Sequence, residues 1–376
     1  MLRLLHLHSS FAAGGKELRA AKLMNAFGKG VEHTVVSAVS GEMAAAAAVG
    51  SHVRVSYPDD FPSLSGRPFP RRLLELARAM QGFDLVLTYN WGAMDAVLAH
   101  TVFARHLGLP PLVHHEDGFN QDEAERLKPA RNWFRRVALT HAQALVVPSQ
   151  RLEHIARTAW GQPARKVVRI ANGIPLAAYG QAAAPDALPR VIKHPGELWL
   201  GTLAGLRAVK NLPRLVRSFA AMPPEWNLVI LGEGPERDAI RAEAVRLELG
   251  HRVHLPGFAA DPAKVLGLFD LFGLSSDSEQ FPISVVEAMA AGLAVASPRV
   301  GDVEAMLAPE NRPFITPAGD DAALGAALAR LAADPDLRAR IGAANRAKAE
   351  AEYDEARMVA AYARVYGDAM GRRSFP

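Results

Sequence analysis

The sequence of 376 residues contains no cysteine. This absence excludes disulfide bonds, thiolate zinc sites, iron–sulfur clusters and a cysteine nucleophile. No stretch approaches the roughly 18 consecutive apolar residues that a membrane-spanning helix needs. The apolar start, MLRLLHLH, is short for a signal peptide and lacks a cleavage site of small residues. These absences predict a soluble, cytoplasmic protein that needs no cofactor.

The net charge is also small, +4, but it is unevenly divided between the two halves of the chain. Residues 1–187 carry 21 Lys and Arg against 15 Asp and Glu, whereas residues 188–376 carry 22 against 24. The basic first half suggests an anionic partner, although an ordinary solvated surface explains the same charges equally well. No zinc-finger or RNA-binding pattern is present, so no nucleic-acid partner is expected.

Short apolar runs alternate with segments of helical period along the whole chain. This alternation predicts two doubly wound α/β domains, each with a parallel sheet. A segment rich in Ala, Pro and Gly, residues 173–197, has no clear period and reads as the linker. The domains are therefore expected to span 1–187 and 188–355, followed by a C-terminal helix at about 356–376. Because ligands bind at the carboxyl ends of such strands, the loops there should carry the chemistry.

Two glycine-containing loops follow expected strands. Gly14 and Gly15 lead into a helix, whose free N–H groups suit an anion, although such a loop is common without any ligand. Gly232 and Gly234 begin a partial dinucleotide motif, but its third glycine is replaced by Arg237. This replacement disfavours a nicotinamide or flavin enzyme.

The stretch SSDSEQFPISVVEAMAAG is the most informative. Pro282 and Ser284 mark a helix start, which places Glu279 in the preceding loop and Glu287 about one turn inside the helix. The backbone N–H groups of residues 283–285 would face an anion, while the two carboxylates accept hydroxyl hydrogens. The arrangement suits a phosphorylated sugar. A helix with one capping acid is the simpler explanation.

A basic and aromatic segment lies in the first half. Lys128, Arg131, Arg135 and Arg136 surround Trp133 and Phe134. Such a helix can sit on an anionic membrane surface. The same pattern arises when the aromatic residues pack inward and the basic ones are solvated.

Several motifs together resemble a known family. The E-x7-E pair of Glu279 and Glu287 resembles the signature of retaining glycosyltransferases of the GT-B fold, especially glycosyltransferase family 4 (glycosyl transferases group 1). Further segments are similar to the family's in the same order: AAGGKELRAAKLMNAF, IANGIP, GTLAGLRAVKN, LVILGEGPER, HRVHLPGF and EAMAAGLAVASPRVGDVEAM. The resemblance covers about 300 residues and implies two Rossmann-like domains facing across a cleft, with the C-terminal helix returning to the first.

The resemblance also implies roles for individual residues. Glu287 would bind the nucleotide ribose, Glu279 the donor sugar, and Lys210 with Arg207 the diphosphate. The acceptor half would contribute His115, or alternatively His114, to the donor sugar. The other implied positions line the diphosphate and sugar (Gly15, Phe281, Pro282, Ile283, Ser284), the base (Gly257, Phe258) and the acceptor (Gly14, Glu116, Asp117).

Two departures from the family pattern concern the donor site. Gly205 stands where the family usually has Arg, and Arg207 lies two residues later. Gln280 replaces a usual glycine. Arg207 reaches the same phosphate by another path, or the site works with one cation fewer.

The resemblance implies a retaining, metal-independent transfer of a sugar from a nucleotide-diphosphate donor to a hydroxyl. No metal-binding cluster of the D-x-D type is expected. A saccharide or lipid-linked acceptor fits, as in lipopolysaccharide, exopolysaccharide or glycolipid synthesis, with the basic half at the inner face of a membrane. The alternatives are a nucleotide-sugar epimerase or sugar-phosphate transferase on the same fold, and a binding protein that has lost turnover.

Overall fold

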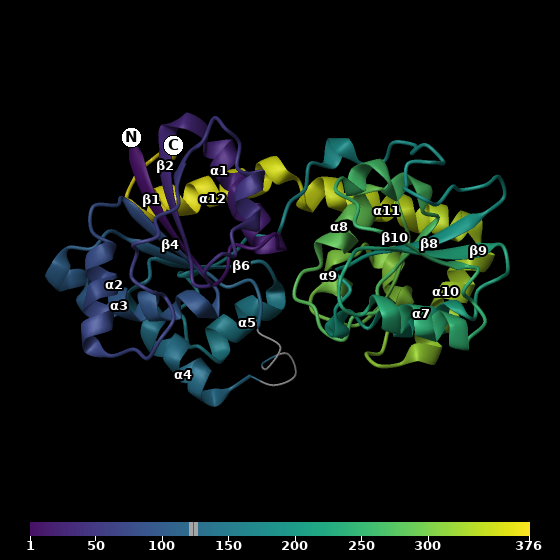
Figure 1. Cartoon of the computed structure of the whole chain (residues 1–376), viewed down its shortest axis with the longest axis horizontal. Helices are drawn as coiled ribbons and strands as arrows, with labels where there is room; N and C mark the ends of the chain where they lie inside the picture. The colour runs from purple at the N-terminus through teal and green to yellow at the C-terminus, as the bar shows by residue number, and fades with distance from the viewer. Residues whose placement is uncertain (120–122, 124–126) are drawn as a thin grey trace. The chain divides into compact units, whose positions relative to one another are not determined.

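The computed structural model describes residues 1–119, 123 and 127–376. They form two compact units (Figure 1). Unit 1 comprises Met1–Asn172 and Arg357–Pro376, and unit 2 comprises Gly173–Ala356. Each unit contains one parallel sheet with helices on both faces, which confirms the predicted fold class.

The sheet of unit 1 has seven strands in the order β3-β2-β1-β4-β5-β6-β7. The strands are β1 (Leu2–His8), β2 (Val31–Ser37), β3 (Arg54–Ser56), β4 (Leu85–Tyr89), β5 (Leu112–His115), β6 (Ala144–Val147) and β7 (Val167–Arg169). The helices are α1 (Gly15–Phe27), α2 (Pro70–Ala79), α3 (Met94–Leu107), α4 (Pro129–Ala138), α5 (Gln150–Thr158) and α12 (Glu355–Ala369). All strand pairings are parallel, as the alternation of elements requires.

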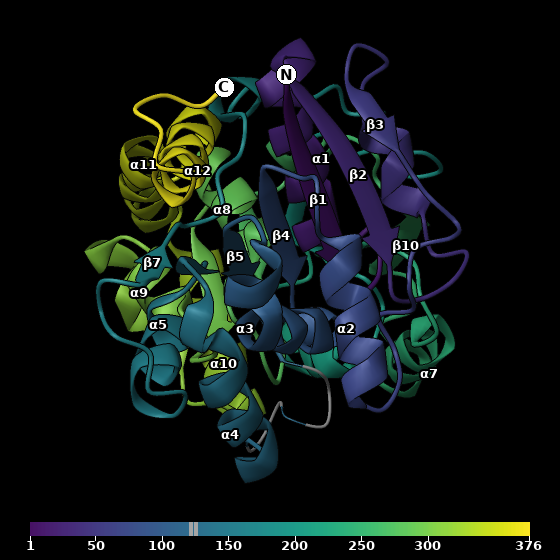
Figure 2. The same cartoon turned by 90° about the vertical axis from the view of Figure 1, so that its left-hand side faces the viewer.

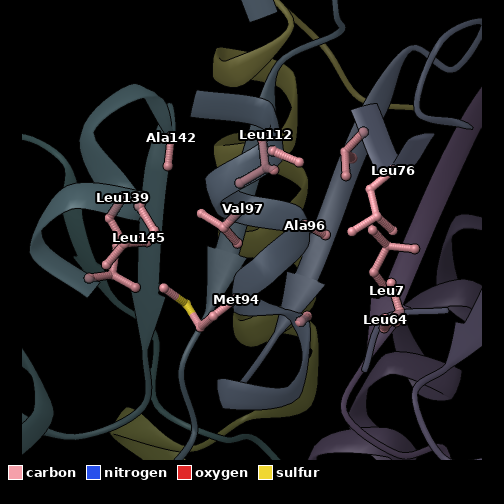
Figure 3. Packing of buried hydrophobic residues seen from close by; sticks show 14 of the residues in the cluster. Leu7, Leu64, Leu76, Met94, Ala96, Val97, Leu112, Leu139, Ala142 and Leu145 are labelled. Atoms are coloured by element: carbon pink, nitrogen blue, oxygen red, sulfur yellow. The ribbon is translucent and has the colours of Figure 1, made fainter. Parts of the chain in front are cut away.

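Helices cover both faces of this sheet. Helices α1 and α12 pack on one face, and α2, α3, α4 and α5 lie together on the other (Figure 2). The central strands are consequently buried on both faces and read as continuous apolar runs. Figure 3 shows Met94 and Val97 close to Leu112 and Leu145 of the sheet, and Leu76 beside Leu7.

The sheet of unit 2 has six strands in the order β10-β9-β8-β11-β12-β13. They are β8 (Leu198–Leu203), β9 (Trp226–Leu231), β10 (Val253–Gly257), β11 (Leu271–Gly273), β12 (Val295–Pro298) and β13 (Ile315–Thr316). The helices are α6 (Leu212–Phe219), α7 (Arg237–Arg246), α8 (Ile283–Ala290), α9 (Val303–Met306), α10 (Asp321–Ala333) and α11 (Pro335–Glu352). Its core is almost wholly apolar.

The units divide at residues 172 and 173 rather than at the expected 187 and 188. The difference has a physical cause, because the linker packs on unit 2. Ile174 pairs with Asp354, and Lys193 bonds to the carboxylate of Asp270 at 2.6 Å. The very short strands β3 and β13 were not predicted, since two or three residues carry no periodic signal.

Two further observations concern sites and membranes. A D-x-D string does occur, at residues 334–336, contrary to expectation; Asp334 caps α11 by accepting a hydrogen bond from the Leu337 N–H at 2.8 Å. Among the described residues, no helix combines the length and apolar character needed to cross a bilayer.

Candidate active site

The loops that follow β8 and β11 meet at the carboxyl edge of the unit 2 sheet. Lys210 Nζ donates to Glu279 Oε1 at 2.5 Å, and the Ser276 hydroxyl donates to the same oxygen at 2.7 Å. The Ser275 hydroxyl bonds to the Lys210 carbonyl at 2.9 Å, which fixes one loop against the other. Both ionic side chains remain partly exposed. The structure therefore brings together two residues that the sequence places 69 positions apart.

Helix α8 begins beside this pair, at Ile283, as predicted. Its N-terminus carries no side-chain cap, so its end is open to an anion. The Val285 N–H instead bonds to the Pro282 carbonyl at 3.1 Å, which corrects the expectation that it would face the anion. Phe281 packs edge-on against Tyr353, with ring centroids 5.6 Å apart.

Glu287 lies one turn inside α8 and is held by a residue that the sequence did not single out. The Tyr179 hydroxyl donates to Glu287 Oε1 at 3.0 Å. Burial, followed by the charge of Glu287, raises the pKa of Tyr179 above its usual value, so this phenol stays a donor. Tyr179 lies in the linker, where no motif marked it.

The Arg207 side chain lies next to Gly205, the position where the family usually has an arginine. It is exposed, and its Nε lies 3.5 Å from where a Cβ on Gly205 would stand. The loop that carries both residues is packed tightly against the next one, because Cβ atoms on Gly232 and Gly234 would collide with the carbonyl oxygens of Ala204 and Leu206. These two glycines therefore serve close backbone contact.

The loop after β10 presents an aromatic side chain to solvent. Phe258 is 74% exposed, directly after Gly257, whose φ of +109° few other residues adopt. The Glu233 carboxylate lies 3.0 Å from the Cβ position of Gly257. Near Glu279, the side-chain oxygen of Gln280 is buried and has no hydrogen-bond partner within the described part of the chain. Gln280 thus offers a free acceptor next to Glu279, whereas Phe258 lies on the loop after the edge strand β10.

In unit 1, the N-terminus of α1 already holds a carboxylate. Gly14 precedes the helix and Gly15 begins it, as predicted. Glu17 folds back over this end, where it accepts a hydrogen bond from Ser10 at 3.1 Å and pairs with Lys16. A Cβ on Gly14 would lie 2.6 Å from the Glu17 carboxylate. The predicted anion site is therefore occupied by the protein's own acid.

Asp117, expected on the acceptor side, is bound by an arginine. Both of its carboxylate oxygens accept from Arg19 of α1, which also bonds to Asn172 at 2.9 Å. Its backbone N–H donates to the side-chain oxygen of Asn90 at 2.8 Å. Burial acts to raise the pKa of Asp117, but the Arg19 charge outweighs it and leaves this pKa below its usual value. A carboxylate paired in this way is a poor general base.

Glu116 is fully buried in a second ionic cluster. Its Oε2 accepts from Arg135 Nε at 3.3 Å and lies 3.6 Å from His114 Nε2. Arg135 also bonds to Glu123, and its guanidinium lies 4.9 Å from the ring of Trp160. The other oxygen of Glu116, Oε1, is buried and has no hydrogen-bond partner among the described residues. Arg135 is also buried, whereas the sequence predicted that it would lie at a membrane surface or in solvent.

His115 lies at the end of β5 with both ring nitrogens bonded inside unit 1. Nδ1 lies 3.1 Å from the Thr88 carbonyl and Nε2 lies 3.0 Å from the Tyr366 hydroxyl. Since a carbonyl only accepts, Nδ1 carries the proton and Nε2 accepts from Tyr366. Burial lowers the pKa of His115 to about 3, so the ring is neutral. As placed here, His115 has no nitrogen left for a donor sugar.

His114 and His115 are both fully buried. Because helices cover both faces of β5, the alternation of side chains along the strand leaves neither ring exposed. His114 bonds through Nδ1 to the Thr88 hydroxyl at 2.8 Å. Neither histidine is accessible to a ligand in this structure.

Comparison with known families assigns both units. Residues 4–178 match the model for Glycosyltransferase Family 4, and residues 189–348 match the model for Glycosyl transferases group 1. The chain belongs to this glycosyltransferase family. The motif resemblance is thereby confirmed over both units of this glycosyltransferase.

Relatives and solved structures are glycosyltransferases of the same type. The chain is 26% identical over 268 residues to a GDP-mannose-dependent alpha-mannosyltransferase of Mycobacterium tuberculosis, covering 69% of this chain and 68% of the relative. A Bacillus anthracis N-acetyl-alpha-D-glucosaminyl L-malate synthase is 26% identical over 45% of each chain, so that match spans less than half of the relative. Anabaena Alr3699/HepE, solved with UDP, has a TM-score of 0.78 at 20% identity, covering 98% of this chain and all of that one. This likeness shows the GT-B fold.

Proposed function

We propose that this glycosyltransferase moves a sugar from a nucleotide-diphosphate donor to a hydroxyl acceptor with retention of the anomeric configuration. The observation that carries the proposal is the Lys210–Glu279 pair beside the uncapped N-terminus of α8. A cation and free backbone N–H groups suit a diphosphate, and a neighbouring carboxylate suits sugar hydroxyls. Structural neighbours solved with UDP and with UDP-glucose support a nucleotide-sugar donor.

In this proposal each donor group has a place in unit 2. Glu287, oriented by Tyr179, accepts hydrogen bonds from the ribose hydroxyls. Phe258 and Gly257 lie against the base, Phe281 to Ser284 along the diphosphate and sugar, and Gln280 offers its free oxygen to a sugar hydroxyl. Lys210 and Arg207 neutralise the diphosphate as it leaves.

The chemical step exchanges one bond at the anomeric carbon for another. The bond to the diphosphate oxygen breaks, the acceptor oxygen bonds to the same carbon, and the acceptor proton passes to the departing phosphate oxygen. We assign the proton to the phosphate because Glu116 and Asp117 are each committed to an arginine. Catalysis then comes from positioning and from stabilising the leaving group by Lys210, Arg207 and the α8 N–H groups, without a metal.

The acceptor is proposed to be a saccharide or a lipid-linked saccharide. Named relatives include lipopolysaccharide core glycosyltransferases of Rhizobium meliloti and a Campylobacter jejuni enzyme whose acceptor is a diphospho-undecaprenol glycan. A lipid-linked acceptor would bring unit 1 to a membrane surface, and the basic first half fits an anionic one at the cytoplasmic side.

A thermal-shift panel of UDP-, GDP- and ADP-sugars tests the donor assignment. One nucleotide should raise the melting temperature of the wild type, and Glu287→Ala should abolish that shift. The matched control is Glu304→Ala, an acid in α9 that pairs with Arg299 at the surface. Stabilisation by none of the nucleotides, or equal loss in both variants, would contradict the assignment.

Incubation of the wild type with the donor that binds then separates the remaining functions. A transferase leaves the donor sugar unchanged without an acceptor, apart from slow hydrolysis, whereas an epimerase converts it. A binding protein without turnover would bind the donor and transfer to no acceptor in a panel of sugars and lipid-linked sugars.

A further inference from the structure

A cavity of about 220 Å³ lies at the carboxyl ends of β2 and β3 in unit 1. It is lined by the last residues of β2, which ends at Ser37, and by residues of the two segments that follow these strands, the second of which starts at Tyr57. None of the residues proposed for donor binding is among its lining. Because ligands of doubly wound sheets bind at the carboxyl ends of the strands, the cavity lies where a substrate is expected.

Hydrogen bonds within unit 1 hold both lining segments in place. The hydroxyl groups of Ser37 and Ser63 each donate to the carbonyl oxygen two residues later, at 2.8 and 3.1 Å. Arg72 of α2 donates through Nη2 to the Ser63 carbonyl at 3.0 Å. The charge of Arg72 is compensated by Asp95, which lies 2.6 Å from its guanidinium. The cavity is therefore formed without a ligand, as small-molecule sites usually are.

The cavity adjoins the loop that leads from β1 into α1. The ring of Tyr57 lies 6.5 Å from that of Phe11, measured between centroids. The Phe11 N–H donates to the Glu42 carbonyl at 3.1 Å, and its carbonyl accepts from the Ala45 N–H at 3.0 Å. The same loop carries Gly14, which the family resemblance places on the acceptor side. The cavity is thus a candidate position for the acceptor rather than for the donor.

The lining combines aromatic rings, free polar groups and a single charge. Tyr57 is 36% exposed, and Phe61 is partly buried against the core. Neither the Tyr57 hydroxyl nor the Asp59 carboxylate has a bonding partner among the described residues. Burial raises the pKa of Tyr57, so its hydroxyl stays protonated and can donate. Among the described residues that line the cavity, none is basic and Asp59 alone is charged.

We propose that this cavity binds one uncharged sugar ring of the acceptor. A pyranose has an apolar face of C–H groups that packs on an aromatic ring, and its neighbouring hydroxyls can both donate to one carboxylate. A phosphorylated or carboxylated sugar would meet the Asp59 charge with no cation in the lining to offset it. The cavity is smaller than the roughly 300–1,000 Å³ of sites for larger ligands, which favours a single ring. The inference rests on the proposed function, because it names the class of acceptor.

Saturation-transfer NMR with the full chain and no donor tests the proposal. The probes are the methyl α-glycosides of glucose, mannose, galactose and N-acetylglucosamine, and each sugar is also supplied as its 6-phosphate. At least one neutral glycoside should receive saturation, and the 6-phosphate of that sugar should bind at least tenfold more weakly. No nucleotide is present, so failure here leaves the donor panel informative, and failure of that panel leaves this result informative.

Variants locate the bound sugar. Asp59→Asn should weaken binding of the neutral glycoside about tenfold, because a hydrogen bond to a charged group is lost. It should also reduce the discrimination against the 6-phosphate, because the repulsion is removed. Asp60→Asn is the matched control, since this neighbouring acid is exposed and does not line the cavity. Tyr57→Ala should weaken the binding of both sugars, and Phe69→Ala, at an aromatic residue that is 61% exposed in the same unit, is its control.

The melting temperature and the donor-induced thermal shift show that each variant is folded. The proposal is overturned if no neutral glycoside receives saturation or if the 6-phosphate binds as well as the neutral sugar. Equal losses in Asp59→Asn and Asp60→Asn would also overturn it. Binding that is lost in Glu279→Gln but kept in Asp59→Asn would place the sugar in unit 2 and would likewise refute the assignment.

Discussion

The two units differ in what surrounds the polar side chains at their strand ends. In unit 1, Glu116 and His115 are fully buried and bonded to residues of the same unit, and both carboxylate oxygens of Asp117 accept from Arg19. In unit 2, Lys210 and Glu279 pair with each other at a partly exposed edge, beside an uncapped helix. A group bonded to arginine or tyrosine side chains of its own unit stabilises the fold, whereas a cation and a carboxylate that pair at an open sheet edge can each exchange the partner for a ligand. This difference is the reason why we propose the donor chemistry for unit 2.

The largest effect is expected where unit 1 loses one member of a buried pair. Arg19→Met leaves the Asp117 carboxylate uncompensated and should lower the free energy of unfolding by about 3–5 kcal/mol, measured by urea denaturation. Lys29→Met, at an exposed position after α1, is the control. The double variant Arg19→Met with Asp117→Leu should regain part of the loss. Equal effects of Arg19→Met and the control would remove the distinction between the units.

In unit 2 the corresponding change should reduce catalysis and leave the fold intact. Lys210→Ala removes a cation from the proposed leaving group and should lower kcat by about a hundredfold to a thousandfold. Its melting temperature without donor should fall less than that of Arg19→Met, because Glu279 keeps its hydrogen bond from the Ser276 hydroxyl. Arg246→Ala, on the exposed end of α7, controls for lost charge. Near-wild-type turnover of Lys210→Ala would refute the site.

The next largest effect is expected at low pH, which should destabilise unit 1 before unit 2. Burial lowers the pKa of His33 to about 4 and that of His115 to about 3, and it also lowers the pKa of His6 and of His8. The folded form keeps these rings neutral while the unfolded chain takes up protons below about pH 6.5, so stability falls as pH drops from 6.5 towards 4. His33 alone accounts for roughly 3 kcal/mol at pH 4.

Hydrogen exchange read by mass spectrometry at pH 7 and pH 5 measures this loss separately for each unit. Strands β1, β2 and β5 should lose protection before β8 and β9, because the buried rings of His6, His8, His33 and His115 belong to unit 1. Simultaneous loss in both units would show that the histidine cluster does not set the acid response.

The smallest effect concerns the linker. Tyr179→Phe removes the hydrogen bond to Glu287 and should weaken donor binding about tenfold, close to 1.4 kcal/mol, by calorimetry. If Glu287 holds the ribose, the variant should also discriminate less between a ribonucleotide and its 2′-deoxy analogue. Tyr57→Phe, a half-exposed position in unit 1, should change neither quantity.

Sequence patterns predicted the parts of the molecule that depend on local order. Alternating periods predicted most strands of both sheets, though not β3 or β13. Pro282 with Ser284 marked the start of α8 and so the positions of Glu279 and Glu287. Partners that come from distant segments left no such signal. Asp117 meets Arg19 across 98 positions and His115 meets Tyr366 across 251, and neither pair has a motif. The burial and pairing of the side chains at the strand ends of unit 1 therefore could not be predicted from the sequence.

Helix α12 has a consequence for how the polypeptide matures on the ribosome. It completes the core of unit 1 through Tyr362 and Tyr366, yet it is translated after all of unit 2. Until then β1 and β5 lack their cover, and Arg19 lacks the Tyr362 ring that its guanidinium faces at 5.5 Å. The core of unit 1 therefore stays incompletely covered until α12 has been synthesised. A nascent chain stalled within unit 2 should consequently be a substrate for chaperones and proteases.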